Sequence, residues 1–136
     1  MISQTQCTQL KYDLLNTYFT SGSFRLALYG LTAVLDNTTT AYTSVGEITG
    51  TGYTAGGAAL TVIPPAIDTT NNTAYVSFKP VVWTPASFSC IGGLIYNAST
   101  NAAVCVLSFG SVRTASNSFT VTFPTFAAST AIIRIS

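Results

Sequence analysis

From residue 24 onward, the chain consists of short runs of β-branched and aromatic residues separated by glycine, asparagine and proline. In the first run, Phe24, Leu26 and Leu28 alternate with residues such as Arg25, which is typical of a half-buried strand. No helical pattern separates these runs, as a parallel α/β fold would require, so about eight strands predict an all-β antiparallel sandwich or jelly roll. The predicted strands are residues 24–29, 39–43, 58–63, 73–83, 90–97, 102–109, 118–123 and 131–135.

A single helical pattern lies at the N-terminus, over residues 3–19. Leu10, Leu14, Leu15 and Tyr18 are spaced three and four residues apart, which predicts an amphipathic helix. We expect it to end at residues 21–23, where a glycine in the left-handed conformation stops a helix. The predicted organisation is an N-terminal helical extension, residues 1–23, and a single β-sandwich domain, residues 24–136.

Several breaks between the runs have a local explanation. Residues 97–101 predict a hairpin connection, because asparagine tolerates the left-handed backbone of tight turns. Pro64 and Pro65 should end a strand, since neither donates a ladder hydrogen bond. Asp36 and Asp68 are expected to cap nearby backbone N–H groups in turns. The glycine-rich residues 45–57 predict an exposed loop or arm that depends on a partner for its order.

Charged residues make up only 7% of the chain, against roughly a quarter in ordinary soluble domains. So few charges indicate a surface that is largely covered in an assembly. The five basic residues are scattered singly, which argues against a nucleic-acid partner. The first residues lack the basic start and apolar run of a signal peptide, and no stretch is long and apolar enough for a membrane span, so no membrane partner is expected.

The residues available for chemistry are few. The chain has no histidine, and its three cysteines, Cys7, Cys90 and Cys105, lack metal-binding spacing, so we predict free thiols, no metal and no cofactor. Cys105 is interpreted as a small buried hydrophobic residue. We predict that the protein is not an enzyme. The alternative is a glycan hydrolase that uses Glu47 with the aspartates.

Residues 24–136 resemble a family of small phage virion structural proteins. The phrase GTGYTAGG at residues 50–57 is the most specific match, and family members place charged or polar residues at several strand positions where this chain has Ala or Cys. The other matching segments are residues 24–29, 38–43, 46–49, 93–97, 119–124 and 131–135.

The resemblance implies a capsid decoration, or cement, protein on the outer capsid surface, assembled in the host cytoplasm. Its partners would be the major capsid protein and further copies of itself, as a dimer or trimer. A tail or fibre-associated structural or receptor-binding protein is the alternative. Apolar residues in extensions and at edges often anchor contacts, so the predicted interface residues are Tyr12, Ile48, Tyr53 and Trp83, although each is also suited to a core and Trp83 more so.

Overall fold

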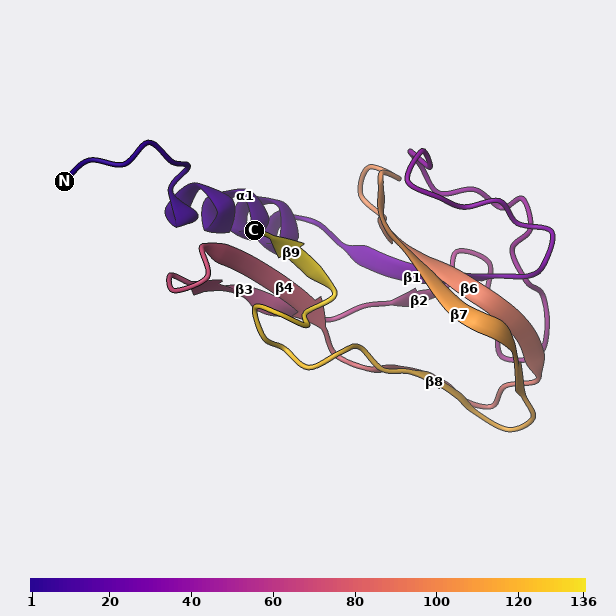
Figure 1. Cartoon of the computed structure of the whole chain (residues 1–136). Coiled ribbons are helices and arrows are strands. Elements are labelled where there is room, and N and C mark those ends of the chain that lie inside the picture. Colours follow the sequence, from indigo (N-terminus) through magenta and orange to yellow (C-terminus); the bar gives the residue numbers. More distant parts are fainter. The chain divides into compact units, whose positions relative to one another are not determined.

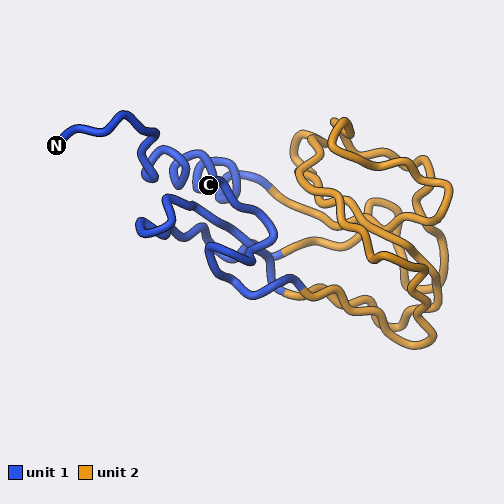
Figure 2. Tube along the Cα trace, in the orientation of Figure 1, with its two compact units in different colours: residues 1–22, 61–79, 123–136 blue, residues 23–60, 80–122 orange.

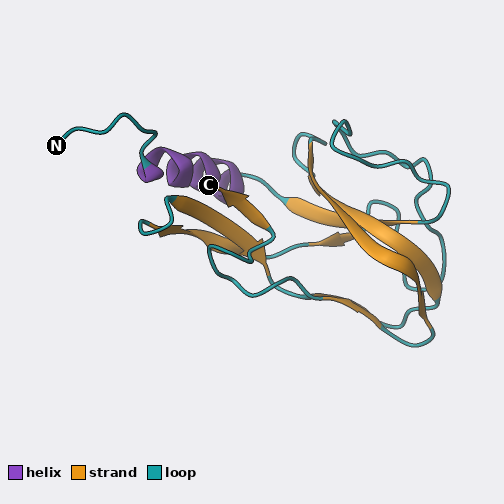
Figure 3. Ribbon diagram, viewed as in Figure 1, coloured by secondary structure: helices purple, strands orange, loops and turns teal.

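The computed structural model describes all residues from 1 to 136. It contains one N-terminal helix and three antiparallel sheets, so the predicted all-β, sandwich-like class is confirmed (Figure 1, Figure 3). The chain forms two compact units, shown in Figure 2: unit 1 comprises residues 1–22, 61–79 and 123–136, and unit 2 comprises residues 23–60 and 80–122. This division differs from the predicted one, because the helix belongs with strands of unit 1 instead of forming an extension.

Unit 1 is a helix packed on a small sheet. Its elements are α1 (Thr8–Ser21), β3 (Val62–Asp68), β4 (Thr73–Phe78) and β9 (Ile133–Ile135), and the strand order is β3-β4-β9. The helix lies against β3 and β4, where the ring centroid of Phe19 is 6.0 Å from that of Phe78. Phe78 also packs 5.7 Å from Phe123, so aromatic side chains from all three segments of the unit form its core.

The helix presents a different face to the sheet from the one that its apolar residues predict. Lys11, Leu15 and Phe19 are buried, whereas Leu10 and Leu14 are 51% and 56% exposed. The ammonium group of Lys11 donates to the backbone oxygen of Asn72 at 2.8 Å, while burial of its aliphatic stem contributes apolar contact. The helix ends where predicted, but Gly22 is extended and not left-handed, with φ of −116°.

The two prolines do not end a strand. Strand β3 continues through Pro64 and Pro65, and its register against β4 shifts between Ile63 and Ala66. Because β3 is the outer strand of its sheet, the missing N–H groups fall at a bulge on an edge, where proline is tolerated. The prediction failed because the sequence does not reveal which strands are edges.

Unit 2 contains a four-stranded and a two-stranded antiparallel sheet. The first has the order β2-β1-β6-β7 and the second pairs β5 with β8. Four predicted strands differ in extent. Residues 39–43 form only an isolated bridge between Ala41 and Ala102, and residues 73–83 break at Pro80 into β4 and β5. Residues 58–63 divide into β2 of unit 2 and the start of β3 of unit 1, and the strand predicted at residues 102–109 continues to Ala115. The strands are β1 (Phe24–Tyr29), β2 (Ala58–Ala59), β5 (Val81–Trp83), β6 (Phe88–Asn97), β7 (Ala103–Ala115) and β8 (Phe119–Val121).

Strand β1 is buried on both faces, not on one as its alternation predicts. Leu26 and Leu28 are fully buried on one face, and Ala27 and Tyr29 are equally inaccessible on the other. The second face is covered because residues of the long β1–β2 connection, including Leu35, pack against Ala27 and Tyr29. The hairpin at residues 97–101 is as predicted, with Asn101 at a positive φ of 65°.

Candidate functional site

The densest polar cluster of unit 2 is centred on Glu47, in the β1–β2 connection. One carboxylate oxygen of Glu47 accepts a hydrogen bond from the hydroxyl of Tyr42 at 2.5 Å. The other accepts from the hydroxyl of Tyr53 at 2.5 Å and from the backbone N–H of Gly56 at 2.8 Å. The hydroxyl of Tyr53 in turn accepts from the backbone N–H of Leu28 in β1. Glu47 therefore ties three points of the connection together and, through Tyr53, to the sheet.

A second set of hydrogen bonds holds the same segment from the sheet side. The hydroxyl of Tyr96 in β6 donates to the backbone oxygen of Gly56 at 2.6 Å, and the guanidinium of Arg25 in β1 donates to Gly56 and Gly57. The ring of Tyr42 stacks on that of Tyr96 at 4.7 Å. Residues 45–57 are consequently fixed by contacts within the chain, and the expectation that a partner orders them is wrong.

Two glycines of the GTGYTAGG phrase explain why this segment approaches the sheet so closely. Gly57 has φ of +83°, and a β-carbon there would lie 1.9 Å from the backbone oxygen of Leu26. Gly52 has φ of +86°, and a β-carbon on Gly52 would lie only 1.8 Å from the backbone oxygen of Pro85. Both the left-handed backbone and the close approach require glycine. Within this chain, the phrase performs a structural task.

The tyrosines around Glu47 are held in the neutral form. Burial, and after it the neighbouring Glu47 carboxylate, raise the pKa of Tyr29 to about 12. Burial and the hydrogen bond to Glu47 raise the pKa of Tyr42 and Tyr53 still further above the ordinary phenol value. These hydroxyls are hydrogen-bond donors at neutral pH: those of Tyr42 and Tyr53 donate to Glu47, and that of Tyr29 donates to the backbone oxygen of Thr43.

Two of the three aspartates of the alternative enzyme hypothesis, Asp36 and Asp68, are turn residues, as predicted, and the third, Asp13, lies in α1. Asp36 accepts from the backbone N–H and the hydroxyl of Thr38, and these bonds, the hydroxyl's first, hold the pKa of Asp36 below its usual value. Asp68 accepts from Asn71 and from the backbone N–H of Thr70, which lowers its pKa in the same way. No group of three or more His, Cys, Asp or Glu side chains is placed to hold a metal ion.

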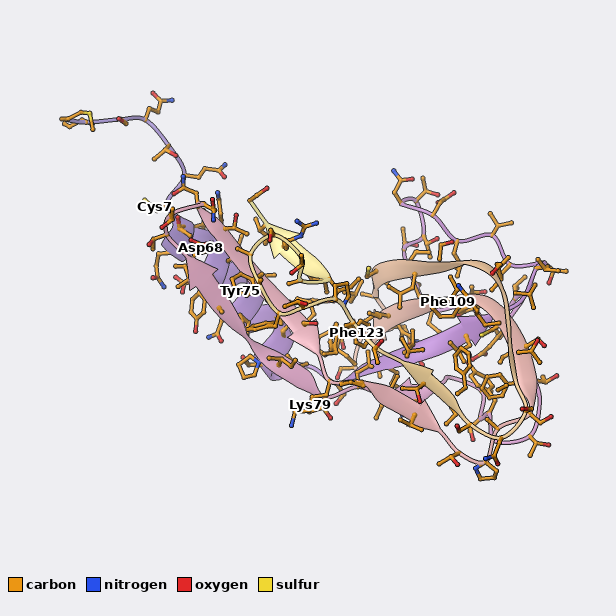
Figure 4. All side chains as sticks on the ribbon, turned by 60° about the horizontal axis from the view of Figure 1, so that its bottom comes forward. Cys7, Asp68, Tyr75, Lys79, Phe109 and Phe123 are labelled. Atoms are coloured by element: carbon orange, nitrogen blue, oxygen red, sulfur yellow. The ribbon has the colours of Figure 1, made fainter.

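All three cysteines are free thiols. Cys7 is exposed at the start of α1 (Figure 4), and Cys90 is buried in β6, where burial raises its thiol pKa to about 11. Cys105 is half-buried in β7 and not fully buried as expected.

Of the four predicted interface residues, one is buried and three are half-buried. Trp83 is 5% exposed, with its ring near those of Tyr53, Phe88 and Phe119. Its burial agrees with the interpretation that, of these four residues, Trp83 is the best suited to a core. Tyr12, Ile48 and Tyr53 are half-buried.

The large apolar side chains that are exposed belong to residues that were not predicted as interface residues. They are distributed over both units, and the sequence signal that could have found those on α1 is a second apolar ridge, at residues 10, 14 and 18. The large ones are Met1, Ile2, Leu10, Leu14, Tyr18, Leu31, Val34, Val45, Ile67, Val82 and Val112.

A groove lies between β7 and β8, within unit 2. Two half-buried aromatic residues, Phe109 of β7 and Phe119 of β8, approach to 6.2 Å between ring centroids (Phe109 is labelled in Figure 4). The outer edges of both strands are open here, because β7 is the last strand of its sheet and β8 pairs only with β5. The residues that line the groove are Phe109, Arg113, Phe119, Thr120, Val121 and Thr122.

Comparisons with known proteins find no similarity. No protein-family model, no curated protein and no solved structure matches the chain. The one helix of the structure is too short and too polar to span a membrane.

Proposed function

We propose that the chain is a structural protein of a tailed phage, a capsid decoration protein that stabilises contacts between major capsid proteins on the outer surface of the head. The observation that carries the proposal is a surface with few charges on which large apolar side chains of both units are exposed. Apolar side chains that stay exposed in an isolated chain are stabilised when a partner covers them. The phage origin rests on the sequence resemblance of residues 24–136, and the assembly role rests on this surface.

The distribution of the exposed apolar residues supports attachment at more than one place. Leu10 and Leu14 form a ridge on α1 of unit 1, while Leu31, Val34 and Val45 lie on the β1–β2 connection of unit 2. Separate contacts on one molecule reinforce one another, because the second forms at a high effective concentration once the first is made. A protein that joins neighbouring capsid subunits would use such an arrangement.

The Glu47 cluster supports the same role. It holds residues 45–57 through hydrogen bonds with two tyrosine hydroxyls and a backbone N–H, so the part of the connection that carries Val45 is ordered before any partner binds. An ordered surface loses less conformational entropy on binding than a flexible one. We therefore assign Glu47 a structural role, and propose that the protein is not an enzyme.

The alternative is a tail or fibre-associated structural or receptor-binding protein. The groove between β7 and β8 favours it, because Phe109, Phe119 and Arg113 offer aromatic surface and a cation to a host ligand. The test that separates the two functions is the copy number in purified particles, measured by quantitative mass spectrometry. A decoration protein should be present in numbers comparable to the major capsid protein and on tailless heads. A tail protein should be scarce and absent from tailless heads, which would overturn the proposal.

The ridge on α1 provides a second test with a matched control. Replacing Leu14 with lysine places a charge at the centre of the ridge, whereas Thr20→Lys adds the same charge at an exposed position away from the ridge. We expect Leu14→Lys to reduce incorporation into particles at least tenfold and Thr20→Lys to leave it nearly unchanged. Equal incorporation of both variants would show that this ridge is not an attachment surface.

A further inference from the structure

The flank of unit 2 between β7 and β8 has the chemistry of a site for one more β-strand. From Val104 onward no strand pairs with the outer edge of β7, and β8 pairs with β5 alone. The unpaired backbone N–H and C=O groups of an open edge are placed to form hydrogen bonds with an added strand. Of the groove-lining residues only Arg113 is charged, so the edge carries little of the charge that normally discourages pairing.

The same chain contains a segment of matching properties. Residues 1–7 have no secondary structure, and every one of them is exposed. Met1 and Ile2 are fully exposed apolar residues, and no side chain of the segment carries a charge. Figure 4 shows the segment extending from Cys7 away from α1. In extended form it would span roughly 23 Å, at about 3.3 Å per residue, which is ample for the three residues of β8.

We propose that the N-terminal segment, residues 1–7, of one copy binds as an added strand in the groove between β7 and β8 of a second copy. Its backbone pairs with the open edges, and Met1 or Ile2 contacts the rings of Phe109 and Phe119. The chain's own segment does not fill this role, because all of its residues remain exposed. Exchange of an identical element between copies is a low-cost route to an oligomer, since each copy supplies both halves of the contact.

The small size of the contact sets the expected strength. A stable interface normally involves about 20–30 residues on each side, so one seven-residue segment gives a weak contact. Reciprocal exchange doubles the number of such contacts, because two segments bind two grooves within one dimer. We therefore expect self-association that depends on concentration. The inference concerns the isolated protein and does not depend on the proposed role in a phage particle.

Two variants separate the two halves of the contact. Deletion of residues 2–6 removes the segment and leaves α1, which begins at Thr8, intact. Thr120→Lys leaves the segment and places a charge on β8 inside the groove, where edge lysines oppose strand pairing. Thr49→Lys is the matched control, because Thr49 is also exposed in unit 2 but does not line the groove. Thermal unfolding verifies that each variant is folded.

The measurement is light scattering coupled to size-exclusion chromatography, with native mass spectrometry, under reducing conditions that prevent a disulfide through Cys7. We expect the full chain and Thr49→Lys to self-associate, and the deletion and Thr120→Lys to do so at least tenfold more weakly. Mixing the deletion with Thr120→Lys should give a heterodimer, because one variant keeps the groove and the other keeps the segment. Since only one of the two contacts can form, this heterodimer should need a higher concentration than the full chain. Hydrogen exchange at residues 107–122 should slow in this mixture.

Three results would overturn the inference. The first is a full chain that stays monomeric at every concentration. The second is a deletion that associates as strongly as the full chain. The third is a mixture of the two variants that forms no heterodimer, which would mean that the segment and the groove do not bind each other. The copy number in particles is unaffected by these results, so this inference and the proposed function fail separately.

Discussion

The two sides of the four-stranded sheet in unit 2 differ in how they are covered. At β1, a connection of residues 30–57 folds back over the sheet and satisfies its polar groups through the Glu47 cluster. That connection reaches only the start of β7, where the backbone oxygen of Thr40 accepts from the N–H of Ala103. Farther along β7 the neighbouring connection is the turn of residues 116–118, which is too short to cover an edge. The difference shows that loop length decides which part of a sheet is closed by its own chain and which part remains open to another.

The largest expected effect is the loss of stability when Gly57, on the β1 side of the sheet, is replaced by alanine. Gly110, in β7, provides the comparison. Gly57→Ala should destabilise the protein by about 3 kcal/mol, because its φ is positive and a β-carbon would meet the backbone of Leu26 at 1.9 Å. Gly110→Ala, at the open flank, has a similar φ of +80° but no atom within 4 Å, so the expected loss is only about 1 kcal/mol. Urea unfolding measures both. Equal losses would contradict a closely packed connection at β1.

Removing the carboxylate of Glu47 should have the next largest effect. Glu47→Ala leaves the hydroxyl of Tyr42 and the N–H of Gly56 without their acceptor, which should lower the free energy of unfolding by about 2–3 kcal/mol. Hydrogen exchange should accelerate in residues 42–57 before it does in β6. Asp13→Asn, at an exposed helical position, is the control and should change stability by less than about 0.5 kcal/mol. An unchanged exchange rate at residues 42–57 would rule out Glu47 as their anchor.

At alkaline pH, the β1 side of the sheet, which residues 30–57 cover, should lose its structure before the rest of the protein. The pKa of Tyr29 is raised to about 12 in the folded protein, and those of Tyr42 and Tyr53 are raised as well, mainly by burial. A raised folded-state pKa contributes stability below the unfolded value of about 10, and that contribution is lost as the pH rises from there through the folded value. Ionisation of Tyr29, Tyr42 and Tyr53, followed by the NMR signals of their rings from pH 8 upward, should coincide with the change in circular dichroism. Ionisation of these three residues near pH 10 with no loss of structure would contradict this expectation.

The smallest change in stability is expected for a substitution in the groove between β7 and β8. Arg113 is exposed, and its side-chain hydrogen bond goes to the backbone oxygen of Phe109 at 3.1 Å. Arg113→Ala should therefore change the free energy of unfolding by less than about 0.5 kcal/mol in urea. A loss comparable to that of Glu47→Ala would mean that the flank stabilises the fold of the single chain, which would weaken its interpretation as an unoccupied site.

Sequence patterns predicted those features that depend on neighbouring residues. The strand at residues 24–29, the hairpin at residues 97–101 and the capping roles of Asp36 and Asp68 all follow from local alternation and turn chemistry. They also predicted the class of the fold, because no helical pattern interrupts the runs after residue 24.

Features that depend on distant contacts were not predictable in this way. Lys11 is buried in place of Leu10 because it reaches a backbone oxygen at Asn72, sixty-one residues away. Residues 45–57 resemble a flexible arm because their anchors, Arg25 and Tyr96, lie elsewhere in the chain. The groove could not be anticipated because it requires knowing that β7 and β8 are both edge strands.

The position of Trp83 has a practical consequence. It is the only tryptophan, it is buried in unit 2, and its ring centroid is 6.5 Å from that of Tyr53. The only helix, in contrast, belongs to unit 1. Tryptophan fluorescence and the helical circular dichroism signal therefore act as separate optical reporters for the two units. Whether their melting curves superimpose will tell directly if the units unfold as one cooperative system or as two.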